Sequence, residues 1–444
     1  MTHDDQHLVF ECGGIVISLE LTSGDQMDSL ELGGRRVLLV SRSDESGRKD
    51  SFLVSRVEVK SSGYSSFLSY LENVREVLVG SSLLRVEQIT DPFSGLCIGV
   101  MHVFNGEPCA QYRWLVEVAG HLVEVVGTTQ GFDLDGIRGH GQEIIKSLHL
   151  DAPSQGSCDH LGWADFAADW MSAGCGAAGG LNELGLAGRE PFPDRVMWVE
   201  SQVRSDWQQL EFTRQEWGLV EEMNSDGLHE FTRHINSKIL KRLGERGVLG
   251  GDSVHEPVAT ALEVRTSTPW LVASGVVDGR NVKVQVWQLA SQILIESSWD
   301  FDEVPADTEG ARTLTWVDAA LGPVILPEFL RLHAGLRTFV GFQLAKEEFV
   351  QVFVDTADLS SVLSQPGAAD IGDQRLKLWG GGPVGAWRVA VDGLEGTLDW
   401  IQTRRGGAFL LVAEDDARYE FEPVSPDDLL GRLLPSLRRG RPGG

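Results

Sequence analysis

The stretch Leu210-Glu-Phe-Thr-Arg-Gln-Glu-Trp217 opens the C-terminal half of the chain and decides how that half folds. Thr213 and Glu216 have the spacing of a capping box, in which each side chain accepts a hydrogen bond from the other residue's backbone amide. Phe212 and Trp217 lie at the positions of a hydrophobic staple around the same helix start. The stretch therefore predicts a capped helix that begins next to Thr213.

A helix-then-strand order continues from this start. The apolar spacing over residues 228–243 predicts a second helix that ends near Gly244, and Ser253-Val-His-Glu256 has the pattern of another capping box. The apolar period then changes to two, which predicts a three-strand meander. Its strands are expected at residues 270–277, 282–289 and 293–299, with Asp278-Gly279 in the first turn.

The same order recurs downstream. Helical patterns around residues 329–363 precede strands expected at 387–391, 396–403, 408–413 and 419–423. Trp270 and Trp387 each begin a meander, and Asp392-Gly393 repeats the turn made by Asp278-Gly279. We interpret the pattern as an internal duplication.

A last helix follows the second meander. Ser425 is expected to cap it, and Pro426 suits its first turn. Asp427 and Asp428 favour the positive end of the helix dipole.

The N-terminal third is rich in short strands. An amphipathic helix is expected at residues 64–79, followed by strands at 83–90, 96–104, 112–119 and 122–129 and a closing helix within 133–150. This order predicts an antiparallel sheet with flanking helices, and it resembles the PsbP-like superfamily, including its actinobacterial members. The chain is thus expected to be α+β, with a PsbP-like domain at 1–152, a Gly/Ala-rich linker at 153–195 and a domain of two similar halves at 196–444.

The C-terminal module resembles the EspG family of chaperones from ESX (type VII) secretion. The resemblance rests on Phe212-Thr-Arg-Gln-Glu-Trp217, Leu243-Gly-Glu-Arg-Gly-Val-Leu249, Trp270-Leu-Val-Ala-Ser-Gly275 and Phe421-Glu-Pro-Val-Ser-Pro-Asp-Asp-Leu-Leu430. It implies a cytosolic, non-enzymatic protein that keeps a helical secretion substrate soluble. Family members commonly reach the substrate with an extended loop, whereas the chain here permits only a tight turn. The residues expected to contact a client are Asp278, Gly279, Arg280, Asn281 and Trp287.

Composition limits the partners. The 444 residues carry a formal charge of -27, which disfavours nucleic acid and anionic lipid headgroups as partners. The acidic N-terminus lacks the pattern of a secretory signal, and no apolar run reaches the length of a membrane span. The five cysteines have unrelated spacings, which favours reduced thiols. A cytoplasmic location without membrane insertion is expected.

Motifs that carry chemistry are incomplete. Gly174-Cys-Gly-Ala-Ala-Gly179 spells a dinucleotide-binding fingerprint, but the required strand does not precede it. Cys158, His160 and Cys175 could bind zinc, yet a fourth ligand and the usual paired spacing are missing. His102, His140 and His149 lie on elements without an adjacent set of carboxylate and nucleophile. We therefore expect no catalytic residues, cofactor or metal.

The leading hypothesis is a chaperone or adaptor for a helical protein client. The alternative is a regulatory or structural scaffold with two protein-docking modules, and the third is an enzyme of unrecognised type. The oligomeric state stays open at this point.

Overall fold

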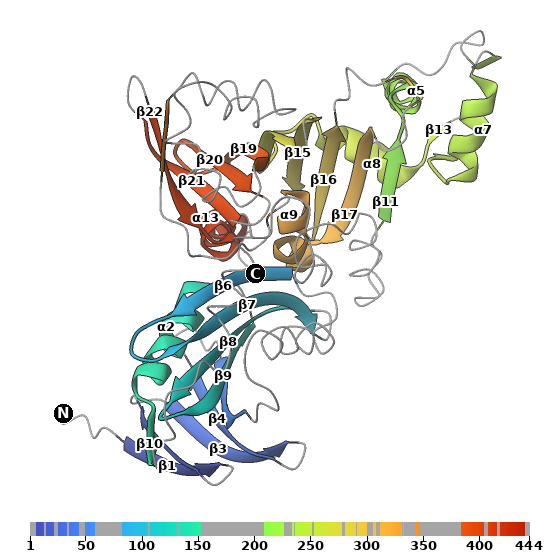
Figure 1. The fold of residues 1–444 in the computed structure, drawn as a ribbon. Helices are drawn as coiled ribbons and strands as arrows, with labels where there is room; N and C mark the ends of the chain where they lie inside the picture. The colour runs from blue at the N-terminus through green and yellow to red at the C-terminus, as the bar shows by residue number, and fades with distance from the viewer. Residues whose placement is uncertain are drawn as a thin grey trace.

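A computed structural model describes residues 6–57, 82–151, 208–345 and 383–439 (Figure 1). Short gaps within these ranges fall at 13–14, 22–24, 33–34, 44–48, 105–106, 131–133, 226–232, 235, 251–252, 278–279, 290, 300–304, 308–310, 331, 333–341, 404–406 and 415–417. The helix expected at 64–79 and the linker expected at 153–195 lie outside the described residues. The described elements form an α+β fold of antiparallel sheets with packed helices.

The N-terminal part contains two antiparallel sheets. The smaller sheet has the order β1-β2-β10, and the larger has the order β3-β4-β5-β9-β8-β7-β6. The smaller sheet consists of β1 (Gln6–Cys12), β2 (Ile15–Leu21) and β10 (His149–Asp151). The larger consists of β3 (Asp25–Leu32), β4 (Arg35–Ser43), β5 (Lys49–Arg56), β6 (Ser82–Ile89), β7 (Ser94–Phe104), β8 (Glu107–Val118) and β9 (His121–Gln130). The last four strands match the expected run.

Helix α2 (Leu134–Lys146) packs closely on this sheet because a glycine faces a large ring. A Cβ placed on Gly141 would lie only 2.1 Å from the Trp114 ring. Trp114 is 1% exposed, and it stacks on Tyr112 with ring centroids 5.8 Å apart. The missing Cβ at Gly141 therefore sets how near α2 can approach β8.

The C-terminal part is built on one ten-stranded antiparallel sheet with a repeated order. Each half is a four-strand meander, and the strand that precedes the meander in sequence pairs with its last strand. The order is β11-β17-β16-β15-β14 in one half and β19-β20-β21-β22-β18 in the other, and β14 pairs with β19 at the centre. The first half consists of β11 (Gln208–Phe212), β14 (Leu271–Val277), β15 (Arg280–Gln288), β16 (Gln292–Trp299) and β17 (Arg312–Asp318). The second consists of β18 (Phe342–Ala345), β19 (Pro383–Val391), β20 (Thr397–Thr403), β21 (Gly407–Glu414) and β22 (Arg418–Val424).

The duplication is therefore present in the strand order, but four of the expected details were wrong. The first meander has a fourth strand, β17, and Phe342–Ala345 form an edge strand within a segment expected to be helical. Trp270 precedes β14, whereas Trp387 lies within β19 opposite Gly275, so these tryptophans do not occupy equivalent positions. Ser253 lies in the short hairpin of β12 (Leu249–Gly250) and β13 (Ser253–Val254) and caps no helix.

Helices cover the ten-stranded sheet on both faces. On the first half, one face packs against α5 (Arg214–Ser225), α7 (Ser237–Glu245) and α8 (Glu256–Val264), which share a core with Trp287 and Trp316. The opposite face of the whole sheet packs against η1 (Ala319–Leu321), α9 (Gly322–Phe329) and α13 (Pro426–Arg439). Among the described helices, none has the length and apolar character needed to cross a membrane.

Helix α13 has two apolar faces and therefore belongs to two cores. Leu429 and Leu433 pack into the core of the ten-stranded sheet. Leu430 and Leu434 pack with the core of the seven-stranded sheet, as does Val324 of α9. In Figure 1, α13 lies between the second meander and β6. The two parts of the chain thus share one layer of helices.

Candidate functional site

The start of α13 carries two carboxylates into the junction between the two parts. The backbone amide of Ser425 lies 3.4 Å from Oδ2 of Asp428, and the amide of Leu429 donates to the Ser425 carbonyl. The predicted helix start is therefore confirmed, with Pro426 as its first residue. Because the helix dipole favours negative charge here, the first turn is a favourable position for Asp427 and Asp428.

Three side chains of the N-terminal part converge on Asp427. Its Oδ2 accepts hydrogen bonds from Nε of Arg85 at 2.8 Å and from the hydroxyl of Tyr112 at 2.7 Å. Nη1 of Arg138 lies 3.2 Å from the same oxygen. These donors come from β6, β8 and α2, so one oxygen of α13 contacts three elements of the other part.

Asp428 extends this network. Its Oδ1 accepts from Nη2 of Arg85 at 2.9 Å and from Nη1 of Arg138 at 2.8 Å. Arg138 also reaches Asp135 at 2.6 Å, and Arg85 forms an ion pair with Glu87. We call the six residues Arg85, Glu87, Tyr112, Arg138, Asp427 and Asp428 the ionic junction.

Burial strongly affects the charged and hydroxyl groups of the ionic junction. The side chains of Arg85 and Asp427 are 2% and 0% exposed. Burial alone would lower the pKa of Arg85, but Asp427, Asp428 and Glu87 together raise it above its ordinary value. Burial, reinforced by Asp427, also raises the pKa of Tyr112 well above its ordinary value. Both arginines therefore stay charged and Tyr112 stays a hydrogen-bond donor at neutral pH.

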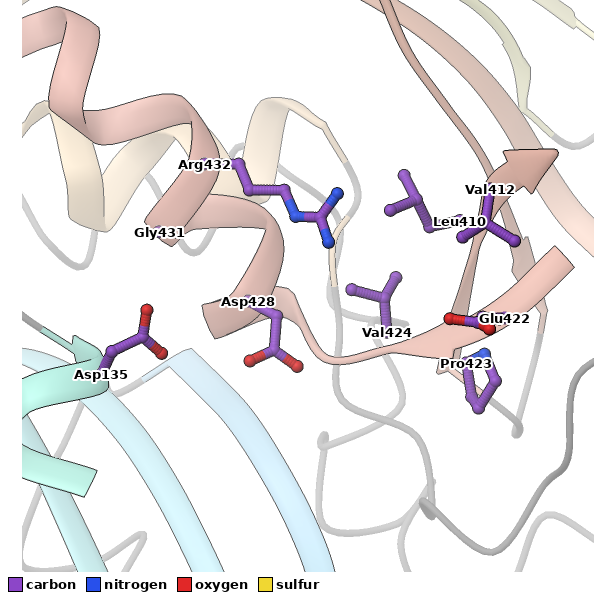
Figure 2. A pocket seen from close by; sticks show the side chains of 9 residues that line it. All are labelled: Asp135, Leu410, Val412, Glu422, Pro423, Val424, Asp428, Gly431 and Arg432. Carbon is purple, nitrogen blue, oxygen red and sulfur yellow. The ribbon is translucent and has the colours of Figure 1, made fainter. Parts of the chain in front are cut away.

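A pocket of about 370 Å³ lies beside the junction (Figure 2). Residues of α13, β21, β22 and α2 line it: Asp135, Leu410, Val412, Glu422, Pro423, Val424, Asp428, Gly431 and Arg432. Figure 2 shows the Arg432 side chain extending from α13 toward β21, while Asp135 and Asp428 lie on the α2 side. The pocket therefore combines an apolar wall with carboxylates from both parts of the chain.

The residues expected to bind a client lie elsewhere. Asp278 and Gly279 are outside the described residues, and Arg280 and Asn281 begin β15 opposite Val277 and Val276. Trp287 is 3% exposed, and its indole nitrogen donates to the carbonyl of Ser267 at 3.2 Å. Its ring belongs to the core under α5 and α8, so in this conformation it offers no surface to a partner.

The described residues include some of the histidines and cysteines considered from the sequence. Nδ1 of His140 lies 3.5 Å from the buried carboxylate of Asp50, which gives this histidine a carboxylate neighbour. Cys97 and Cys109 are both buried. Cys158, His160 and Cys175 lie outside the described residues, and the described part contains no cluster of three or more His, Cys, Asp or Glu suited to a metal.

Sequence reasoning identified two of the six residues of the ionic junction. Asp427 and Asp428 were visible as acidic residues of a helix start. Arg85, Tyr112 and Arg138 carry no comparable signal, because more than 280 positions separate them from α13 and no spacing rule connects them.

These features define a two-part α+β protein whose sheets share a helical layer. No protein-family model and no curated protein matches the chain. Among solved structures, a Pseudomonas aeruginosa protein of unknown function is 15% identical, with 32% of this chain and 96% of that chain covered and a TM-score of 0.23. Cyanobacterial PsbP from Synechocystis is 12% identical, with 30% and 86% covered and a TM-score of 0.22. A Bacteroides thetaiotaomicron protein is 11% identical, with 61% and 83% covered and a TM-score of 0.22. The likeness to PsbP is distant, and none of the three matches assigns a function.

Proposed function

We propose that this chain is a cytoplasmic, non-enzymatic chaperone or adaptor that binds a helical protein client, a substrate of type VII secretion. The observation that carries the proposal is the repeated strand order of the ten-stranded sheet, with a capped helix after its first edge strand. The resemblance to EspG-type chaperones rests on the sequence of those same elements. An amphipathic client helix is recognised through its apolar face, which packs into a hydrophobic groove of the partner.

Several contacts stabilise the capped start of α5. The amide of Thr213 donates to Glu216 at 2.9 Å, and the amide of Glu216 donates back to the Thr213 hydroxyl at 3.1 Å. Phe212 and Trp217 pack edge to face with centroids 5.2 Å apart. Arg242 adds an ion pair to Glu216 at 2.8 Å. The start of α5 is therefore fixed by local and long-range contacts.

Two surfaces are candidates for the client contact. One is the β14–β15 turn with Arg280 and Asn281, as the family resemblance implies. The other is the pocket beside the ionic junction, where Val412 is 44% exposed. Binding at either surface requires no cofactor, nucleic acid or membrane.

The experiment is co-expression of the full chain with each small helical protein encoded beside its gene. We expect one of them to co-purify as a stoichiometric complex, measured by size-exclusion chromatography with light scattering. Arg280→Glu is expected to weaken the complex, whereas Lys283→Glu, an exposed position on the same strand, serves as the matched control. Retention of no helical partner, or turnover of a small metabolite by the purified chain, would overturn the proposal.

The scaffold alternative makes a different prediction. A scaffold with two docking modules would bind separate partners through the N-terminal and C-terminal parts. The shared helical layer argues against independent movement of these parts, because α13 contributes to both cores. Recovery of several substoichiometric partners would favour the scaffold.

A further inference from the structure

We propose that the pocket between α13, α2 and the β21–β22 hairpin receives the side chain of a lysine or arginine from a bound protein partner. This inference rests on the proposed function for the identity of the partner as a helical client. It adds the chemistry of the contact, which the family resemblance does not supply.

The size and walls of the pocket fit one long side chain. Its volume of about 370 Å³ is near the lower end of the range for small-ligand sites, about 300–1,000 Å³, so it admits a side chain but not a helix. Leu410 and Val424 contribute apolar surface, and Val412 is one of two large apolar side chains that are exposed in the described part of the chain. Such a wall suits the methylene stem of lysine or arginine, which gains by leaving water while its charged end stays polar.

The charges around the pocket indicate that its occupant is a cation. In the ionic junction and the pocket together, three arginines face five carboxylates: Arg85, Arg138 and Arg432 against Glu87, Asp135, Glu422, Asp427 and Asp428. Arg85 and Arg138 pair with Asp427 and Asp428, so Arg432 is the one arginine of this set that remains to balance Glu422 at the pocket wall. The local excess of negative charge, within a chain of formal charge -27, attracts a cation and repels an anion.

The pocket lies at an accessible position on the surface. We therefore expect its occupant to come from another molecule. Glu422 and Val412 are both exposed on neighbouring strands, and Arg432 is exposed on the adjacent turn of α13. A basic residue on the polar edge of a client helix could therefore insert without any movement of the shared helical layer.

The test uses two synthetic probes on the full chain. Both are 20-residue amphipathic helical peptides with the same leucine face, one with lysine and one with glutamate on the polar face, and binding is followed by fluorescence anisotropy. The wild-type chain is expected to bind the lysine peptide at least tenfold more tightly. Glu422→Lys should remove most of that preference. Glu420→Lys, which makes the same charge change two residues earlier on β22 and outside the pocket, should retain it.

The outcomes separate the pocket from the general field of the protein and from the proposed function. Equal weakening by Glu422→Lys and Glu420→Lys would show attraction to overall charge and overturn the proposal. A client that binds the Glu422→Lys chain as tightly as the wild type would overturn the pocket but leave the chaperone proposal standing. If the wild-type chain retains no client, the chaperone proposal fails, while a tenfold lysine preference lost only in Glu422→Lys still supports the pocket.

Discussion

Asp427 Oδ2 and Arg85 Nε are joined by a hydrogen bond of 2.8 Å across a sequence separation of 342 residues. This contact links the first turn of α13 to the edge strand β6 of the N-terminal sheet. Burial of such a pair adds little net stability relative to an apolar pair, but loss of one partner leaves an uncompensated charge. The contact therefore restricts how the two parts of the chain can be arranged.

Asp427→Asn is expected to destabilise the protein strongly. It removes the charge that Arg85 and Arg138 share, and breaking a buried ion pair typically costs about 3–5 kcal/mol. The free energy of unfolding in urea is the measurement. Asp399→Asn is the control, because its partner Arg388 is 67% exposed and surface pairs contribute about 0–1 kcal/mol. Equal losses in the two variants would contradict the buried role of Asp427.

Tyr112→Phe should change how stability depends on alkaline pH. The pKa of Tyr112 is raised in the folded state by burial and by Asp427, so its stabilising contribution is complete below pH 10 and declines as pH rises above that value. The wild type should lose up to about 1.4 kcal/mol per pH unit from this residue alone. In the variant that component of the slope disappears, and parallel curves for the two chains would refute the assignment. Urea titrations from pH 8 to 11 provide the measurement.

Two glycines of α2 should respond in opposite directions to alanine. Gly141→Ala places a methyl group 2.1 Å from the Trp114 ring and should lower stability by about 1–3 kcal/mol, as overpacked cores do. Gly139→Ala meets nothing within 4 Å and should raise stability by about 0.5–1 kcal/mol, because alanine favours the helix. The thermal unfolding midpoints of both variants provide the measurement. An unchanged midpoint in Gly141→Ala would mean that α2 can move away from β8.

Glu216→Gln should destabilise the start of α5. The carboxylate is 1% exposed and serves the Thr213 amide, Arg242 and Arg246 together. Because hydrogen bonds to charged groups contribute about 1.5–3 kcal/mol, the loss should fall in that range. Glu221→Gln on the same helix is the control, since its carboxylate is 46% exposed and pairs only at the surface with Arg265. Hydrogen exchange of the α5 amides should rise in Glu216→Gln and not in the control.

His102 should make the N-terminal part sensitive to mild acid. Burial, with the nearby charge of Arg113, lowers the pKa of His102 below its ordinary 6.5. Because the pKa of His102 is lower in the folded state than in the unfolded state, neutral His102 contributes to stability above pH 6.5. This contribution is lost as the pH falls below 6.5. His102→Gln should have a flatter stability profile between pH 7 and pH 5. An unchanged profile would assign the acid sensitivity to other groups.

Much of the fold could be predicted from the sequence where the deciding contacts are local. The capping box at Thr213, the helix start at Ser425 and seven strands of the two meanders depend on residues within a few positions of one another. The wrong predictions concern elements whose structure depends on a partner that is distant in sequence. Phe342–Ala345 have no strong strand pattern, yet they pair with β22 because that edge of the sheet is available to them.

The sequence by itself determined the period of most described elements, the succession of two meanders, and the acidic first turn of α13, because these properties follow from side chains that are neighbours along the chain. Only the tertiary structure decided that Leu430 and Leu434 belong to a second core, and that Asp427 meets Arg85, Tyr112 and Arg138. The physical reason is that burial and ion pairing depend on distances in space. A helix with apolar residues on two faces does not show which sheet each face will cover.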